Sequence, residues 1–150
     1  MQLEEAIKQQ KKFNSEFEKL YVNLIYTSGI LESGSIQRFK QFGISPQQYN
    51  VLRILRGSGA KPLMLGDIAS RMIDKNSNTT RLVEKLRLKG YVRREICSNN
   101  RRQVDILITK KGQDLLADME KDLNSWFNSL QTLTQGEAAT INQLLDKLRG

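Results

Sequence analysis

The chain has 150 residues and a mass of 17.2 kDa, enough for one domain or a compact core with helical extensions, and its 39% hydrophobic and 27% charged residues are typical of a globular protein. It contains no histidine, one cysteine, no glycine-rich phosphate loop and no nucleophile elbow, so we expect no catalysis, no metal site and no cofactor. The net charge of +8 gathers in residues 71–112, which carry twelve Lys/Arg against four Asp/Glu, whereas residues 113–150 carry three against six.

The amino-terminal segment carries apolar residues at helical spacings of three and four, from Leu3 to Leu31, with no proline between them. We predict one long helix there, then a break at Ser33-Gly34-Ser35 and a short apolar piece that ends at Gly43. The start of this segment is charged, and no apolar run in the chain approaches the roughly 18 residues that a membrane span needs. We therefore expect a cytoplasmic protein with no membrane partner.

Three shorter helices are predicted next. Ser45 offers a cap and Pro46 a first helical residue, and the helix that they begin should end near Gly57. A two-turn helix falls within residues 63–72, and a further helix runs from Thr79 to a left-handed stop at Gly90. The polar residues 75–78 offer capping side chains, so these last two helices should be joined by a tight polar turn.

From residue 91 onward the apolar period changes from 3.6 to 2, which predicts two antiparallel strands on either side of the polar residues 98–102. Thr109 can cap a long helix that reaches Leu130, and Thr134 with Glu137 forms a capping box for a final helix. The predicted fold is mainly α with a small β-hairpin.

Two short helices joined by a tight turn and followed by a basic hairpin are typical of a winged helix-turn-helix, in which the second helix enters the major groove of DNA. At 100° per residue, Thr79, Leu82, Val83 and Leu86 share one face of that helix, and Ser77, Thr80, Arg81 and Glu84 lie opposite. The basic segment could be only a solvated face, but its turns and alternating strands favour a nucleic acid over an anionic membrane.

We identify two groups of candidate DNA-binding residues. Arginine can bond guanine edges, and Asn or Thr can contact adenine edges or thymine methyls. The candidates in the helix are Lys75, Asn76, Ser77, Asn78, Thr80 and Arg81, and those in the hairpin are Asn99, Asn100, Arg101 and Arg102. Lys75, Lys85, Arg87 and Lys89 suit phosphate contacts better than base reading. Ser77 and Asn78 could instead act only as caps, and Arg81 could pair with Glu84.

The segment from residue 78 to residue 112 contains two sequence motifs. R-L-V-x-x-L-x-x-x-G-[YL]-V-x-R matches Arg81 to Arg94, and R-x-x-x-I-x-I-T-x-x-G matches Arg102 to Gly112. With these motifs the segment resembles the MarR family of bacterial transcriptional regulators. The resemblance implies a winged helix-turn-helix at residues 44–112 and long dimerisation helices at 1–32 and 113–150. It also implies a homodimer on a pseudo-palindromic operator that represses transcription until a small-molecule effector intervenes.

Two residues depart from the family pattern. The family's wing usually begins Asp-x-Arg, and Asn100 stands at the acidic position, so the usual ion pair that braces the wing arginine cannot form in that way. The short helix after Leu63 usually has a Ser or Thr cap, whereas Met64 has no side-chain acceptor. The wing should therefore be less rigid, and the start of this helix less well fixed.

Three further features have alternative interpretations. Tyr26, Phe39, Phe42 and Tyr49 could line an effector pocket or could be ordinary core residues. Cys97, at the base of the wing, is either an inert thiol or a redox sensor. Our leading hypothesis is a sequence-specific regulator of double-stranded DNA, and the alternative is a helical protein–protein adaptor whose basic region only solubilises it.

Overall fold

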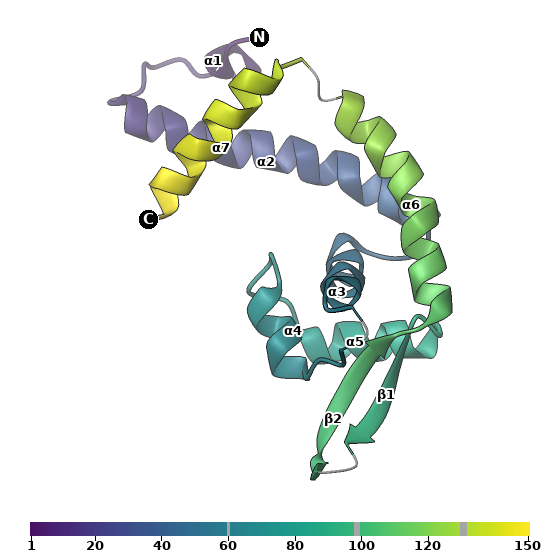
Figure 1. Ribbon diagram of the computed structural model, residues 1–150. Helices are drawn as coiled ribbons and strands as arrows, with labels where there is room; N and C mark the ends of the chain where they lie inside the picture. The colour runs from purple at the N-terminus through teal and green to yellow at the C-terminus, as the bar shows by residue number, and fades with distance from the viewer. Residues whose placement is uncertain (60, 98–99, 130–131) are drawn as a thin grey trace. The chain divides into compact units, whose positions relative to one another are not determined.

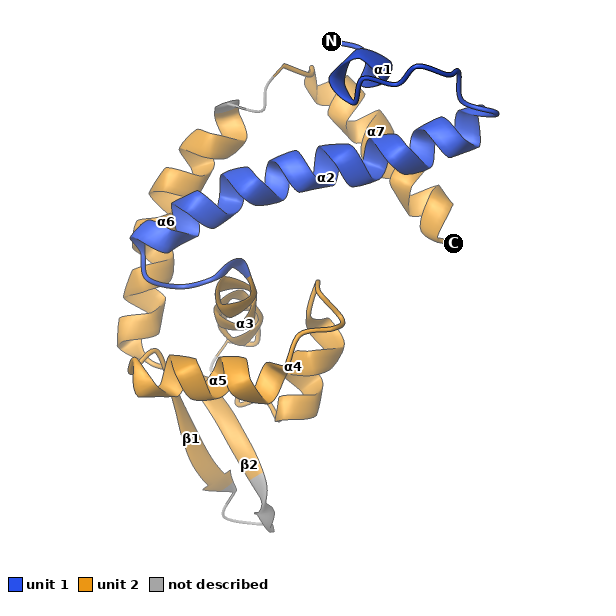
Figure 2. Cartoon of the chain, turned by 180° about the vertical axis from the view of Figure 1, so that it is seen from behind, with its two compact units in different colours: residues 1–46 blue, residues 47–150 orange. Residues whose placement is uncertain are grey.

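The computed structural model describes residues 1–59, 61–97, 100–129 and 132–150, the side chains of residues 97, 100–103 and 129 excepted. This part of the chain forms seven helices and one two-stranded antiparallel sheet, so the prediction of a mainly α fold with a small hairpin is confirmed (Figure 1). Two compact units divide the chain, Met1–Pro46 and Gln47–Gly150 (Figure 2).

The first unit contains α1 (Leu3–Ala6) and α2 (Glu16–Gln41), so the predicted single helix over residues 3–31 is wrong. Lys8, with a φ of 54°, follows α1, and α2 begins after Ser15, whose side chain accepts the Glu18 backbone N–H at 3.1 Å. The predicted break at residues 33–35 is also absent. The Ser33 hydroxyl donates to the carbonyl of Gly29 at 2.8 Å, and this local bond lets serine sit inside the helix.

The second unit begins with three helices, α3 (Pro46–Gly57), α4 (Leu65–Arg71) and α5 (Thr79–Leu88). Both ends of α3 lie where the sequence predicts them. Met64 makes no side-chain cap, as expected, but its backbone N–H donates to the Asp67 carboxylate at 3.2 Å. The start of α4 is therefore fixed by an acid in its first turn, which sequence reasoning overlooked.

The core of this unit is built from the apolar faces of the three helices and from the hairpin. Its fully buried side chains include Val51, Leu52, Ile68, Val83, Leu86 and Ile106. Burial of each such side chain stabilises the fold by about 1.5–3 kcal/mol, so this core is the main source of stability for the region that carries the candidate site.

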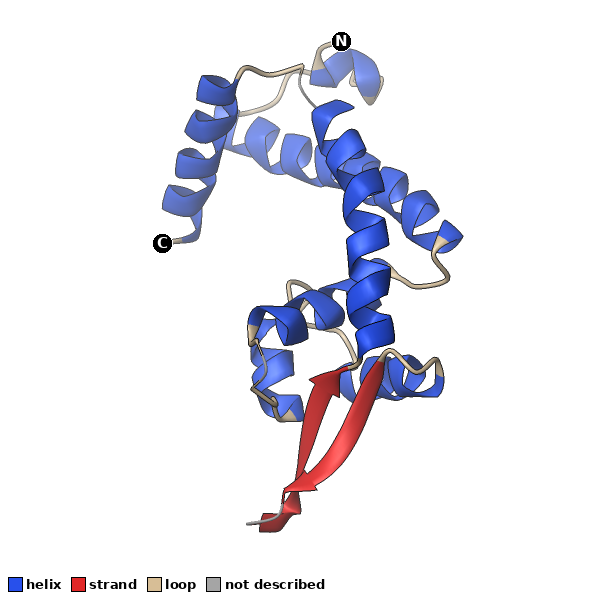
Figure 3. Ribbon diagram, turned by 45° about the vertical axis from the view of Figure 1, so that its right-hand side comes forward, coloured by secondary structure: helices blue, strands red, loops and turns tan. Residues whose placement is uncertain are grey.

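The hairpin consists of β1 (Val92–Cys97) and β2 (Asn100–Ile108), paired from Val92 with Ile108 to Ile96 with Val104. Its base is anchored, because Leu63 and Ile106 exchange two backbone hydrogen bonds at 3.1 and 2.8 Å. Its far end leaves the core: Val92 is buried, whereas Ile96 is 70% exposed. The strands accordingly project beyond the helices (Figure 3).

Helix α6 (Lys110–Ser129) starts at a tight junction with the end of α5 and the hairpin. The backbone N–H and hydroxyl of Thr109 donate to the carbonyls of Tyr91 and Gly90 at 3.0 and 2.7 Å, and the same hydroxyl accepts the Gly112 N–H at 3.2 Å. A Cβ on Gly112 would collide with the Tyr91 carbonyl oxygen and lie 2.8 Å from Ile108 Cγ1. Only glycine fits at this position.

The two closing helices differ in burial. Helix α6 buries Leu116, Met119 and Leu123, and its Glu120 forms an ion pair with Arg56 of α3. Helix α7 (Gln135–Arg149) begins with the predicted capping box, in which Thr134 accepts the Glu137 N–H at 3.3 Å, but none of its residues is buried. Its apolar face is exposed in a single copy of the chain.

Candidate nucleic-acid interface

The orientation of α5 agrees with the helical pattern. Thr79, Val83 and Leu86 are buried, whereas Thr80 and Arg81 are exposed. Asn78 caps the helix, because its side-chain oxygen accepts the Arg81 backbone N–H at 3.0 Å. Asn78 therefore has a structural role whether or not it also contacts DNA.

Ser77 differs from its predicted outward position. Its hydroxyl oxygen is buried and has no hydrogen-bond partner among the described residues. The residue precedes the first turn of α5, and its backbone N–H donates to the Asp74 carbonyl at 3.2 Å in the preceding turn. The 100° rule applies only inside a helix, so it misplaced this side chain.

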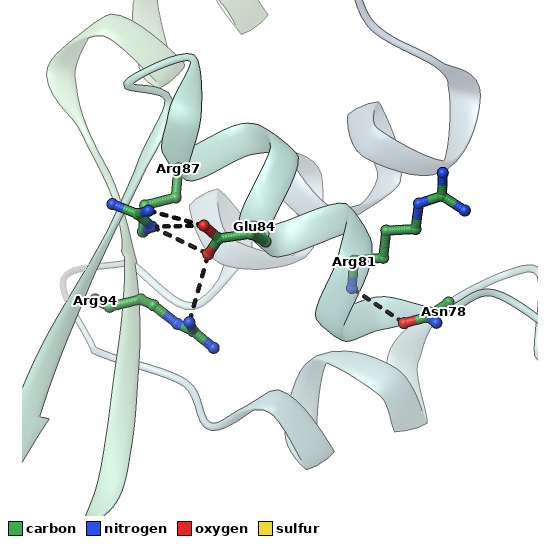
Figure 4. Close-up of polar contacts among 5 residues, drawn as sticks. All are labelled: Asn78, Arg81, Glu84, Arg87 and Arg94. Atoms are coloured by element: carbon green, nitrogen blue, oxygen red, sulfur yellow. Dashed lines mark hydrogen bonds and ion pairs between the residues drawn. The ribbon is translucent and has the colours of Figure 1, made fainter.

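Arg81 does not pair with Glu84. The Glu84 carboxylate instead accepts from Nη2 and Nε of Arg87, at 2.7 and 3.0 Å, and lies 3.4 Å from Nη1 of Arg94 on β1 (Figure 4). The hydrogen bonds from Arg87 are the main reason that the pKa of Glu84 lies below its ordinary value. Within the described part of the chain, the Arg81 guanidinium has no hydrogen-bond or ion-pair partner.

The turn before α5 holds the other two candidates of this group, Lys75 and Asn76. The Lys75 ammonium donates to the Ser70 carbonyl at 2.7 Å, and the Asn76 N–H donates to the Asp74 carboxylate at 2.9 Å. Both residues are exposed. These local bonds hold the turn in shape and keep its polar side chains next to the start of α5.

Two concavities flank the outer face of α5. One, of about 330 Å³, lies at its amino-terminal end and is lined by Ser77, Asn78 and Arg81 together with Gln47, Asp74 and Lys85. The other, of about 770 Å³, lies between α5 and β1, where Glu84, Arg87, Arg93 and Arg94 supply the charged lining. Sequence reasoning did not single out Arg94. The available signal was Glu84, the one acidic residue between residues 75 and 94.

The candidates in the hairpin cannot be placed in the same way. Asn99 lies outside the described residues, and so do the side chains of Asn100, Arg101 and Arg102, although the backbone of these three belongs to β2. Cys97 is the last residue of β1, at the far end of the hairpin, so its predicted place at the base of the wing is wrong. Its side chain also lies outside the described residues. The roles of these five residues stay predictions.

The four aromatic residues predicted for an effector pocket have different surroundings. Phe39 is buried, Phe42 is half-buried and Tyr26 is 37% exposed, all within the first unit. Tyr49 belongs to the second unit, where its hydroxyl accepts from Arg53 at 2.9 Å. A pocket that contains all four stays a prediction.

Among the described residues, no three His, Cys, Asp or Glu side chains gather as they would to hold a metal ion. No helix in the same part of the chain has the length and hydrophobicity to cross a bilayer.

Comparison with known proteins decides the family. The MarR family model matches residues 44–104, which contain α3, α4, α5 and most of the hairpin. The crystal structure of a MarR transcription factor from Planctomyces limnophilus is 30% identical, with a TM-score of 0.69 and coverage of 90% of this chain and 98% of that one. The chain belongs to the MarR family. It is a DNA-binding transcriptional regulator, and the family assignment agrees with the expectation that it is not an enzyme.

Two further proteins are similar to most of this chain, one in sequence and one in fold. YfiV, an HTH-type transcriptional regulator of Bacillus subtilis (strain 168), is 28% identical over 130 residues, which are 86% of this chain and 78% of that protein. The organohalide-sensing regulator RdhR-CbdbA1625, in its 2,4-dichlorophenol-bound form, shares the fold with a TM-score of 0.81 at 17% identity, covering 94% of this chain and 86% of that one. The winged-helix fold predicted from the sequence is thereby confirmed.

Proposed function

We propose that this chain is a sequence-specific regulator that binds a pseudo-palindromic operator as a homodimer and represses transcription until a small-molecule effector releases it. One observation supports sequence-specific binding. Arg81 lies on the outer face of a capped helix, and its guanidinium has no hydrogen-bond or ion-pair partner among the described residues. A free, exposed arginine of this kind can form two hydrogen bonds to the edge of a guanine in the major groove. Such a regulator acts where the chromosome lies, in the bacterial cytoplasm.

The charge distribution supports DNA as the partner. Residues 71–112, which carry the net charge of +8, include α5, the hairpin and the turn before α5. We assign DNA contacts near the start of α5 to Lys75, Asn76, Ser77, Asn78, Thr80 and Arg81, with Lys75 suited to a phosphate and Arg81 to a base edge. We assign minor-groove or backbone contacts to Asn99, Asn100, Arg101 and Arg102.

Exposed apolar surface supports the homodimer. On α7, Leu144 is 60% exposed and Leu148 is 58% exposed, and α2 likewise exposes Phe17, Tyr21 and Ile25. Apolar faces of this extent on two long helices are typical of surfaces that another chain covers. The second copy would also supply a second α5, which a pseudo-palindromic operator requires.

The effector is supported by likeness of fold alone. RdhR-CbdbA1625 has the same fold and is known in complex with 2,4-dichlorophenol. We assign Tyr26, Phe39, Phe42 and Tyr49 as the aromatic residues that would contact an effector here. Release of a preformed operator complex by a panel of phenols, with 2,4-dichlorophenol as the first probe, tests this assignment, and Phe42→Ala should weaken the response.

Selection of bound sequences from a random duplex pool tests DNA recognition, symmetry and spacing together. We expect inverted half-sites whose centres lie about one helical turn apart. Recovery of unrelated sequences would contradict sequence-specific binding.

Titration with salt separates the regulator from the adaptor. A dimer that contacts roughly six to ten phosphates should lose about 10³- to 10⁵-fold in affinity between about 50 and 200 mM salt. A response that is independent of salt would favour a protein–protein adaptor with a solubilising basic region.

A further inference from the structure

The concavity between α5 and β1 brings together charged side chains from a helix and a strand. Arg87 belongs to the last turns of α5, and Arg94 belongs to the first strand of the hairpin. The Glu84 carboxylate lies between them and accepts from both guanidinium groups, at 2.7 Å and 3.4 Å (Figure 4). A single acid therefore holds one arginine from the helix and one from the hairpin at the same place.

The concavity has room and charge for an anion. Its volume is about 770 Å³, and the side chains of Arg87 and Arg94, which line it, are 43% and 34% exposed. Arg93 at its rim pairs with Glu95 at 3.1 Å. The three arginines and the two carboxylates, Glu84 and Glu95, together carry one net positive charge. The guanidinium groups of Arg87 and Arg94 also retain N–H donors that Glu84 does not accept.

The geometry of duplex DNA indicates which anion would bind in this concavity. A helix in the major groove and a hairpin in the flanking minor groove lie on opposite sides of one sugar-phosphate strand, because that strand separates the two grooves. It must therefore cross the gap between α5 and β1, where this concavity lies.

We propose that the concavity is a phosphate site for the strand between the two grooves, with Arg87 and Arg94 as donors to one phosphodiester and Glu84 as the positioning residue. Guanidinium groups suit this task because their planar N–H pairs match phosphate oxygens. The inference rests on the proposed function, since it needs α5 and the hairpin to occupy neighbouring grooves. It adds Arg94, which lies outside both groups of predicted DNA-binding residues.

A scan with methylphosphonate linkages tests the site directly, because each such linkage removes one phosphate charge and leaves the bases unchanged. The selected operator is synthesised with one neutral linkage at each successive position, and the wild-type protein should lose about tenfold in affinity at the linkage between the two grooves. Arg94→Ala and Arg87→Ala should bind the unmodified operator more weakly and lose much less on neutralisation of that linkage. Both should keep the wild-type response at every other position.

The salt dependence provides a second measurement. Each lost phosphate contact should reduce the slope of log affinity against log salt by roughly 0.9, or about 1.8 for a dimer that carries the substitution in both copies. Arg149→Ala is the matched control, because Arg149 is also an exposed arginine paired with an acid three residues earlier, Asp146, but lies on α7. This control should leave the slope and the linkage scan unchanged.

Glu84→Gln tests the positioning role. Loss of the carboxylate should reduce the specific effect of the linkage between the grooves to about threefold or less, because the two guanidinium groups are no longer held together. Circular dichroism and thermal unfolding should remain as in the wild type. An unchanged linkage effect in this variant would show that Glu84 does not position the arginines.

The outcomes distinguish this inference from the function on which it rests. If the wild-type protein selects no operator, the proposed function fails. If it selects an operator but Arg87→Ala and Arg94→Ala respond to the linkage between the grooves as the wild type does, the phosphate site is wrong while the function stands.

Discussion

Helices α5 and α7 share an amphipathic pattern but differ in what covers their apolar sides. Helix α5 buries Thr79, Val83 and Leu86 within its own unit, whereas α7 buries none of its residues and leaves Leu144 and Leu148 more than half exposed. An amphipathic pattern predicts a helix with an apolar face, but it does not tell which molecule will cover that face. The apolar side of α5 is covered within one chain, whereas the apolar side of α7 is exposed in one chain.

The largest expected effect is a loss of folding stability when a buried residue of α5 is replaced. Leu86 is fully buried, so Leu86→Ala should lower the free energy of unfolding by about 2–5 kcal/mol, through lost burial and the cavity that remains. Urea unfolding at a fixed protein concentration measures this change. Leu144→Ala is the matched variant on α7, and an equal loss at concentrations where the protein is monomeric would contradict the comparison.

A charge on the exposed apolar face of α7 should dissociate the proposed homodimer without unfolding the chain. Leu144→Asp should shift sedimentation from dimer to monomer at micromolar concentration and should weaken operator binding, because the two half-sites are then bound separately. Its circular dichroism spectrum should stay helical. Leu123→Asp is the contrasting variant, since Leu123 is only 3% exposed and its replacement should unfold the chain.

The two helices also differ in their arginines. Arg81 on α5 has no acidic partner among the described residues, whereas Arg149 on α7 pairs with Asp146. Arg81→Ala should cost about 1–3 kcal/mol on the selected operator and much less on random duplexes, as expected for a contact to a base edge. Equal losses on both kinds of DNA, measured by fluorescence anisotropy, would make Arg81 a backbone contact. Arg149→Ala should have no effect on either.

Glu84 brings a negative charge to the face of α5 that we assign to DNA. Because the proposed phosphate contact carries no sequence information, Glu84→Gln should lower affinity for the operator and for random duplexes alike, on the order of threefold. The preference for the operator over random DNA should stay unchanged. A higher affinity for random duplexes would show that repulsion between the carboxylate and DNA outweighs its positioning role.

The smallest expected effect concerns the ion pair between α3 and α6. The hydrogen bond from Arg56 is the main reason that the pKa of Glu120 is below its ordinary value of 4.5. The pair therefore stabilises the fold above that value and loses its contribution as the pH falls through the lowered pKa. Both side chains are partly exposed, so Glu120→Gln should cost under about 1 kcal/mol at neutral pH and flatten the decline of stability in acid.

Much of the winged-helix region could be predicted from the sequence because its signals are local. Pro46, Asn78, Gly90 and Thr109 each mark an element end through a backbone angle or a hydrogen bond within a few residues. The single cap at Ser15 was overlooked, and with it the division between α1 and α2. Serines inside α2 were misinterpreted as a break because a sequence does not show where a hydroxyl will bond.

The arrangement of charges around α5 could not be predicted in the same way. Glu84 has basic residues three positions away on both sides, Arg81 and Arg87, and helical spacing allows either pair. Spacing alone does not choose between them, and Glu84 pairs with Arg87 at 2.7 Å. Its second contact, with Arg94, has no local signal, because Arg94 lies ten residues further along on β1.

The junction at Gly112 determines how closely α6 approaches the winged-helix region. In a helix interior alanine is normally preferred to glycine by about 1 kcal/mol, but here any side chain would push α6 away from Tyr91 and Ile108. Thr109 and Gly112 bind the first turn of α6 to the end of α5 and the base of the hairpin. These three elements are consequently held to one another at the junction. A change in the placement of α6 should therefore shift the end of α5 and the base of the hairpin with it.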